Sequence, residues 1–288
     1  MSAASLTAKL GWRTPLVILI CGCLVSALGF GPRSTLGFFL TPLSFAHGWG
    51  RDIFGLALAL QMLLWGVGQP FAGALADRFG PFLVLSAGAL LYTAGLILMA
   101  YSTTPGMLYL TAGVLVGFGL AGSSFTIVLG AFGKLMPPEW RSISFGAGTA
   151  AGSFGQFFFS PLAIGLIDNI GWQETLVAFA AIVLLIIPVA WALTPPRTAA
   201  KPAAAILQPQ SLKQSLAEAC GHRSYMLLVI GFFTCGFQLF FIAVHLPAYL
   251  VDQGISNRIG GISLPKAPST MVKDDPASPN PTNTPAVR

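Results

Sequence analysis

Residues 53–76 contain no charged side chain, and this apolar run ends abruptly at Asp77 and Arg78. A helix rises about 1.5 Å per residue, so a run of this length can cross the roughly 30 Å hydrocarbon core of a bilayer. Further apolar runs of similar length precede and follow it. The chain is therefore predicted to be an all-α integral membrane protein that lies in a lipid bilayer.

The composition agrees with a membrane protein and excludes several other classes. Hydrophobic residues make up 55% of the 288 positions and charged residues 8%, whereas about 25% of residues are charged in an average soluble domain. The basic residues fall mainly between the apolar runs, where they act as topology signals, so no nucleic-acid partner is expected. The four cysteines lack metal-ligand spacing, and no metal or cofactor is expected.

Six apolar spans with short connections predict a compact N-terminal bundle over residues 1–195. The first span is expected to be either long and tilted or broken near residues 29–32, because Pro32 removes a helix hydrogen bond. Asp77 is expected to begin the third helix, where the helix dipole favours a carboxylate. Residues 137–141 are expected to form a turn. The six spans are residues 14–45, 53–76, 82–101, 106–133, 142–167 and 172–193.

The rest of the chain divides into three parts. Residues 196–223 are rich in Ala and Pro and are expected to be a cytoplasmic central loop, with a short amphipathic helix possible at 212–219. Residues 224–254 form a seventh transmembrane helix, and residues 255–288 have the composition of a disordered tail. Nearly all basic loop residues gather on one side of the spans, which predicts a cytoplasmic N-terminus in the inner (plasma) membrane.

Arg33 interrupts the first apolar span and is the most informative single residue for function. An Arg at mid-membrane costs roughly 2.5 to 3.5 kcal/mol, so it usually faces a water-filled cavity or a partner. A guanidinium in that position would offer paired donors to a carboxylate. The alternative is that Arg33 lies near the outer end of the helix and extends to the interface. The sequence leaves both interpretations open.

Gln61, Gln156 and His245 are further candidates for substrate contact, because they place polar side chains inside apolar spans. A polar group in lipid seeks any hydrogen-bond partner, so contacts between helices explain such residues as well. His245 could also carry protons, since imidazole titrates near neutral pH. A neutral imidazole that is satisfied near the outer end of the seventh helix explains it equally.

The turn after the opening run recurs in outline on the opposite side of the predicted bundle. Asp77-Arg-Phe-Gly80 joins spans two and three, and Asp168-Asn-Ile-Gly171 joins spans five and six. The pattern carries little information by itself. Its recurrence three helices later is nevertheless what an inverted repeat of three helices would produce.

Several segments together resemble the major facilitator superfamily. Gly73-Ala-Leu-Ala-Asp77-Arg78-Phe-Gly80 is similar to the superfamily's loop motif between helices two and three. Four stretches resemble its monocarboxylate porter and oxalate:formate antiporter branch, in which helix one carries a basic residue: 30–39, 61–70, 231–238 and 245–250. The resemblance implies that the four named motif residues act in conformational change and that Arg33 acts in substrate binding.

The resemblance implies a secondary active transporter of small organic anions, either monocarboxylates or dicarboxylates, and not an enzyme. Proton symport and antiport both stay open. Such transporters have twelve helices in two halves, and here the resemblance ceases after the seventh. A truncated or frame-shifted product is therefore expected, whose independent activity is doubtful and for which a separate C-terminal half is a candidate partner. The alternatives are a seven-helix receptor or sensor and a non-transporting remnant.

Overall fold

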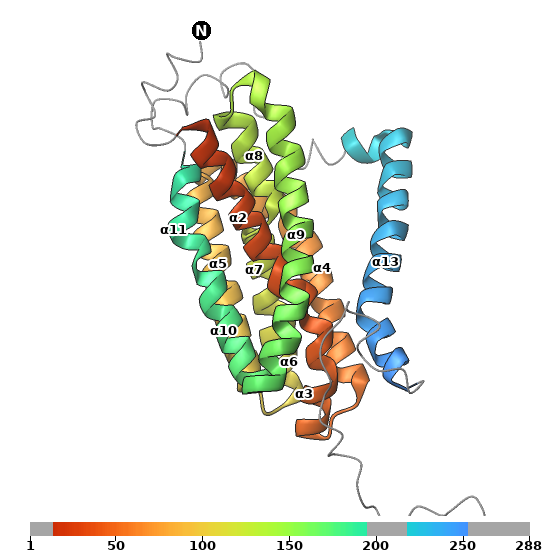
Figure 1. The fold of residues 1–288 in the computed structure, drawn as a ribbon. Helices are drawn as coiled ribbons and strands as arrows, with labels where there is room; N and C mark the ends of the chain where they lie inside the picture. The colour runs from red at the N-terminus through yellow and green to blue at the C-terminus, as the bar shows by residue number, and fades with distance from the viewer. Residues whose placement is uncertain (1–13, 195–217, 253–288) are drawn as a thin grey trace, which may run out of the picture.

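The computed structural model describes residues 14–194 and 218–252, and Figure 1 shows them as a bundle of long helices with one further helix beside it. No strand occurs in these two ranges. Six helical segments are long and apolar enough to cross a membrane, which confirms the predicted all-α membrane fold. They are Pro15–His47, Arg51–Phe79, Pro81–Ala100, Pro105–Leu135, Pro138–Ile170 and Trp172–Leu193.

The first span is broken near its middle. α2 (Pro15–Ser34) passes into a short 3-10 segment, η1 (Leu36–Phe39), before α3 (Leu40–His47) continues the span. Thr35 at the junction donates its hydroxyl to the carbonyl oxygen of Pro32 at 2.8 Å. The break lies just beyond the predicted position at 29–32. Pro32 still lies inside α2, and the α-helix gives way to the 3-10 segment only after Ser34.

The second and third spans are α4 (Arg51–Phe79) and α5 (Pro81–Ala100), and they meet at Gly80. The prediction that Asp77 begins the third helix is therefore wrong, because Asp77 lies in the last turn of α4. α5 begins instead at Pro81, whose fixed φ suits the first helical position. The carboxylate consequently lies at a helix C-terminus, where the dipole does not favour it.

The fourth span is divided into four pieces, which the uninterrupted apolar run at 106–133 did not indicate. The helix is broken at Ser124, whose φ of −71° and ψ of 148° are extended and not helical. The pieces are α6 (Pro105–Leu108), a π-helical stretch η2 (Tyr109–Leu115), α7 (Val116–Gly122) and α8 (Phe125–Leu135).

The fifth span is α9 (Pro138–Ile170), which begins within the segment predicted to be a turn at 137–141. That prediction is wrong because Pro138 occupies the first helical position, where a missing N–H removes no hydrogen bond. The sixth span consists of α10 (Trp172–Leu184), α11 (Ile186–Ala190) and a final 3-10 turn, η3 (Trp191–Leu193).

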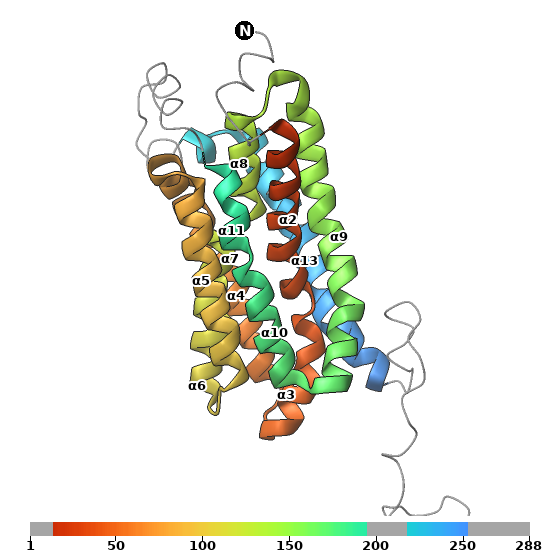
Figure 2. The same ribbon diagram turned by 60° about the vertical axis from the view of Figure 1, so that its left-hand side comes forward.

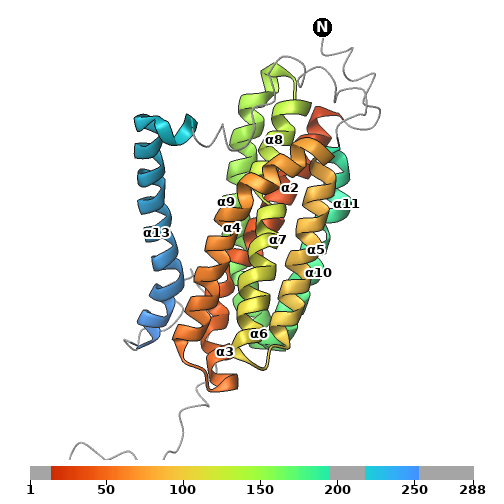
Figure 3. The ribbon, with the colours of Figure 1, turned by 180° about the vertical axis from the view of Figure 1, so that it is seen from behind.

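The six spans interlock as two groups of three. α2 packs mainly on α9, α4 packs mainly on α7, and α5 packs on both α7 and α10. Figure 2 shows α2 between α9 and α11, and Figure 3 shows α7 between α4 and α5. Each of the first three spans thus has its main partner among the last three, and the six share one core.

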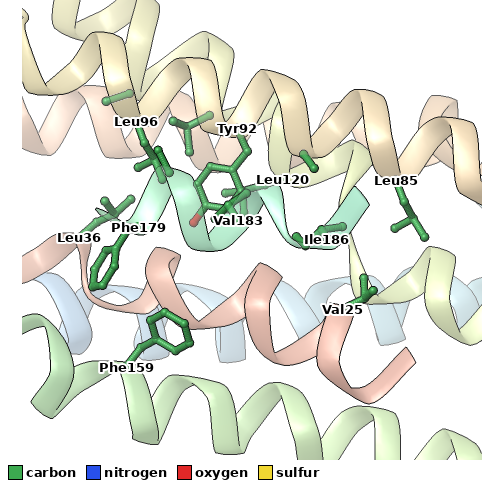
Figure 4. Packing of buried hydrophobic residues seen from close by; sticks show 14 of the residues in the cluster. Val25, Leu36, Leu85, Tyr92, Leu96, Leu120, Phe159, Phe179, Val183 and Ile186 are labelled. Atoms are coloured by element: carbon green, nitrogen blue, oxygen red, sulfur yellow. The ribbon is translucent and has the colours of Figure 1, made fainter. Parts of the chain in front are cut away.

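The shared core is filled by aromatic and aliphatic side chains from several spans (Figure 4). Phe179 of α10 contacts rings from two other spans. Its ring centroid lies 6.2 Å from that of Phe39 and 5.6 Å from that of Phe159. Tyr92 of α5 is fully buried in the same core. The core therefore connects α10 to the first and fifth spans through direct ring contacts.

Glycine lets several helices approach to backbone contact. A Cβ atom on Gly155 of α9 would lie 2.5 Å from the carbonyl oxygen of Ala27 in α2. A Cβ atom on Gly117 of α7 would lie 3.0 Å from the carbonyl oxygen of Gln61 in α4. Small residues at helix contacts are typical of membrane proteins, where close packing replaces the hydrophobic effect as the driving force.

The two Asp-x-x-Gly turns have nearly the same geometry. Gly80 has φ 91° and ψ 153°, and Gly171 has φ 87° and ψ 165°. Each glycine ends one long helix and begins the next, at opposite ends of the bundle. We call the end with the Gly80 turn the motif end and the end with the Gly171 turn the far end. The matching turns agree with the predicted inverted repeat.

The last described helix, α13 (Arg223–Asp252), covers most of the predicted seventh span. Figures 1 and 3 show it apart from the bundle, and it approaches the bundle at η1. Rings stack along one side of α13, with centroids 6.5 Å apart for Phe233 and Phe237 and 6.0 Å apart for Phe237 and Phe241. Most of the predicted central loop, at 196–217, and the predicted tail at 255–288 lie outside the described residues.

Candidate functional site

Arg33 lies deep within the first span. At about 1.5 Å per residue, it is about 27 Å from Pro15 and about 21 Å from His47 along the span. The far end carries an aromatic cluster, in which the ring centroid of His47 is 4.4 Å from that of Trp49 and 5.9 Å from that of Trp172. Tryptophans gather at membrane interfaces. A hydrocarbon core of about 30 Å between the two ends would contain Arg33, which favours the mid-membrane interpretation.

The guanidinium of Arg33 is held by aromatic and thioether groups. Its Cζ atom lies 4.3 Å from the ring centroid of Trp65 and 5.8 Å from that of Phe30. Its Nη2 donates to Sδ of Met62 at 3.2 Å. Met62 and Trp65 lie one turn apart on α4, so both reach the same side chain. The groups in these three contacts are uncharged, and the aromatic faces attract the cation through their quadrupoles.

A narrow pocket lies beside this guanidinium. Its walls come from the end of α2, from Trp65 of α4 and from the break between α7 and α8. The ring of Phe30 packs edge-on against Trp65, with centroids 6.1 Å apart, and against Phe125, with centroids 5.4 Å apart. The pocket therefore joins three spans around one basic residue.

The break in the fourth span places the N-terminus of α8 at this pocket. Ser123 turns its hydroxyl back to the carbonyl oxygen of Gly119 at 2.8 Å, and the side chain of Ser124 does not cap an N–H group of α8. The first N–H groups of a helix have no partner within the helix and lie at the positive end of its dipole. Since Phe125 begins α8 and lines the pocket with Arg33, two sources of positive potential face the same space.

A chain of hydroxyl and amide groups leads from this pocket toward the motif end. The Oγ of Ser124 and the Oγ1 of Thr126 are 2.7 Å apart, and Thr126 donates to Oε1 of Gln69 at 2.7 Å. Thr126 and Gln69 line a second pocket of about 420 Å³. Polar groups are thus continuous between the two pockets.

The predicted loop motif borders this second pocket. Gly73 and Asp77 line it, and the Oδ1 of Asp77 lies 2.6 Å from the Nζ of Lys134 in α8. Arg78 lies outside the pocket, with its Cζ 5.3 Å from the ring centroid of Phe79. The motif is therefore joined to the fourth span by an ion pair.

Of the four residues predicted to contact substrate, Arg33 lines the narrow pocket. Gln61 is fully buried where α4 meets α7, and within the described ranges its amide nitrogen and oxygen have no hydrogen-bond partner. Gln156 is half-buried on α9, next to the close contact of Gly155 with α2. His245 belongs to α13, and its side chain lies outside what the structure describes. The structure does not bring Gln61 or Gln156 into the pocket of Arg33.

Sequence reasoning missed Trp65, Met62 and Lys134 as site residues. A signal existed for the first two, because an aromatic ring and a thioether one turn apart on a neighbouring span are suited to hold an intramembrane guanidinium. Lys134 marked only the end of an apolar run, and its partner Asp77 is 57 residues away. Distance along the sequence concealed that pair.

The family model of the Major Facilitator Superfamily matches residues 22–272, a range that includes the Arg33 pocket and the loop motif. The chain belongs to this superfamily. Six candidate spans and this family together make it a multi-pass membrane protein. The family predicted from the sequence is thus confirmed.

Relatives of the superfamily are similar over most of the chain. The uncharacterized MFS-type transporter YcxA of Bacillus subtilis is 25% identical over 241 residues, which cover 81% of this chain and 57% of that protein. Monocarboxylate transporter 13 of Rattus norvegicus is 26% identical over 257 residues, covering 85% and 54%. Monocarboxylate transporter 3 of the same species is 28% identical over 254 residues, covering 85% and 49%. These similarities confirm the monocarboxylate branch, and the chain spans about half the length of the curated relatives that it matches.

Proposed function

We propose that this chain contains the six-helix N-terminal half of a secondary transporter for small organic anions, in which Arg33 binds the carboxylate. The observation that carries the proposal is a guanidinium at mid-membrane depth that contacts Trp65 and Met62 and lines a pocket. A cation within the hydrocarbon core is costly unless a cavity or an opposite charge faces it. The names of the two monocarboxylate transporters among the relatives support the same class of substrate.

The groups that line the pocket suit a compact mono- or dicarboxylate. The pocket itself has a volume of about 10 Å³, room for about one water molecule, so the proposal requires it to widen when the anion binds. The guanidinium offers parallel N–H donors to two carboxylate oxygens. The N-terminus of α8 adds backbone N–H groups and the positive end of a helix dipole, as interrupted helices do in other transporters. Gln61, Gln156 and His245 stay predictions as further substrate contacts.

The transport mechanism in this proposal needs a second six-helix half, because alternating access moves two halves against each other around a central site. In this proposal the basic loop residues set the orientation. They place the N-terminus in the cytoplasm and the protein in the inner (plasma) membrane. The Asp77 turn then lies at the cytoplasmic face. Proton symport and anion exchange are both compatible with a single carboxylate site.

Binding of labelled oxalate, formate and lactate to the chain in lipid nanodiscs tests the site. We expect at least one of these anions to bind, and neutral lactamide not to displace it. Arg33→Ala should weaken binding at least tenfold, and Arg33→Lys should weaken it less because the charge is kept and the fork is lost. Arg51→Ala is the matched control. Arg51 is the first residue of α4 and does not line the pocket, so this variant should bind normally. Unchanged affinity in Arg33→Ala would contradict the proposal.

Uptake into proteoliposomes separates a transporter from the two alternatives. The chain alone and a version extended through twelve helices are compared. We expect uptake only with the extended version. Faster uptake under an inside-alkaline gradient would indicate proton symport, and faster uptake after preloading with the anion would indicate exchange. Binding without uptake in either sample would favour a receptor or sensor, and neither binding nor uptake would favour a non-transporting remnant.

A further inference from the structure

We propose that Trp65 has two roles in the site of Arg33. Its indole ring positions the guanidinium, and its Nε1–H donates a hydrogen bond to the carboxylate that Arg33 binds. The second role rests on the proposed function, whereas the first concerns the protein without substrate. Trp65 is therefore both a positioning residue and a second anion-binding residue.

The positioning role follows from the contact between ring and cation. The Cζ of Arg33 lies over the ring of Trp65 at 4.3 Å, well within the distance at which a cation is attracted to an aromatic face. Met62, one turn earlier on α4, accepts a hydrogen bond from Nη2 and fixes the other side of the guanidinium. A long side chain held at two points cannot sample the orientations that a free arginine would.

The donor role follows from an unused hydrogen-bond group. The Nε1 of Trp65 is buried, and it has no hydrogen-bond partner within residues 14–194 and 218–252. A buried indole N–H nearly always has a partner, because leaving it unpaired costs free energy. Trp65 and Arg33 line the same narrow pocket. In this proposal the pocket widens on binding, and the anion then accepts from both side chains.

The type of residue also fits the two roles. A phenylalanine at position 65 would present an aromatic face to the guanidinium but no donor, and an aliphatic residue would present neither. A tryptophan supplies the stronger cation–π face together with an N–H at its edge. A carboxylate, which has several acceptor lone pairs on two oxygens, is the class of ligand that can accept from both side chains at once.

Three variants separate the roles. Trp65→Phe keeps a ring and removes the N–H, Trp65→Leu removes both, and Trp140→Phe changes an exposed tryptophan at the start of α9 as a control. Two readouts are measured on the full chain in nanodiscs. One is the affinity for oxalate and lactate, and the other is the rate at which phenylglyoxal, an arginine-specific reagent, modifies Arg33, followed by mass spectrometry.

We expect Trp65→Phe to weaken binding of the carboxylate about tenfold, which is typical of losing one hydrogen bond to a charged group. The same variant should leave the modification rate of Arg33 within twofold of the rate in the unmodified chain. Trp65→Leu should weaken binding further and raise the modification rate several-fold. Trp140→Phe should change neither readout. Normal affinity in Trp65→Phe would overturn the donor role, and an unchanged modification rate in Trp65→Leu would overturn the positioning role.

Arg33→Ala distinguishes a failure of this inference from a failure of the proposed function. If Arg33→Ala loses binding and Trp65→Phe does not, only the donor role is overturned. If Arg33→Ala binds as the unmodified chain does, or if the unmodified chain binds neither anion, the proposed function and the donor role are both contradicted. The modification rates decide the positioning role in every case.

Discussion

The Nζ of Lys134 lies 2.6 Å from the Oδ1 of Asp77, and this ion pair ties the end of α8 to the end of α4. Both side chains are largely exposed, with 53% of Lys134 and 74% of Asp77 accessible. An exposed pair of this kind contributes about 0 to 1 kcal/mol to stability. Its effect is therefore to hold the loop motif against the fourth span, not to stabilise the bundle as a whole.

A double-mutant cycle with Asp77→Asn and Lys134→Gln tests this view of the pair. Each single change should lower the free energy of unfolding by less than about 1 kcal/mol, and the double variant should be no less stable than either single variant. The coupling should shrink at high salt because exposed charges are screened. Unfolding in detergent at two salt concentrations measures the coupling energy. If either single change lowered the free energy of unfolding by more than about 2 kcal/mol, the pair would be structurally essential.

Gly80→Ala should destabilise the protein by about 1 to 3 kcal/mol, because a φ of 91° with a ψ of 153° is essentially restricted to glycine. No neighbouring atom would obstruct the added Cβ, so the effect isolates backbone strain. Gly146→Ala, at an exposed helical position of α9 with the same open surroundings, is the control and should be neutral or slightly stabilising. Thermal unfolding in detergent compares them. Equal stability of the two variants would show that the turn tolerates another conformation.

Gly155→Ala should destabilise the protein by about 1 to 3 kcal/mol for a different reason, since the added Cβ would press on the backbone of Ala27 and separate α9 from α2. Gly165→Ala lies on the same helix, where nothing is within 4 Å of the added atom, and it should have little effect. The free energies of unfolding of both variants provide the measurement. A tolerated Gly155→Ala would mean that the two helices can move apart at little cost.

Gln61→Leu should raise the free energy of unfolding by about 1 to 3 kcal/mol, because a buried amide without partners among the described residues is replaced by an apolar side chain of similar size. Carboxylate affinity of the same variant decides whether Gln61 also contacts substrate, because Gln61 does not line the Arg33 pocket in this structure. Unfolding and binding are measured on the same preparation. Weaker binding with unchanged stability would instead support Gln61 as a substrate contact, as the sequence alone predicts.

Several elements of the fold could be predicted because they depend on local chemistry. The spans follow from uncharged runs, and the Gly80 and Gly171 turns follow from a residue type that tolerates positive φ. The start of α9 was misjudged because proline disrupts a helix interior but suits its first position. The break at Ser124 had no charge or proline beside it and so left no clear mark in the apolar run.

The candidate site was predictable only in part. Arg33 could be identified because a charge inside an apolar span is costly wherever it faces. The spacing of Met62 and Trp65 on α4 made them suitable partners, but only the packing of α4 against α2 brings them to Arg33. The same holds for Lys134, which meets Asp77 only after α8 packs near the end of α4.

The sequence by itself determined that the chain spans a membrane, to which superfamily it belongs and which basic residue lies inside a span, because these properties reside in residue types and short spacings. Only the tertiary structure decided what surrounds that residue. The neighbours of Arg33 come from three spans, and the rotation and break of each helix, set by packing at small residues, determine which side chains meet there.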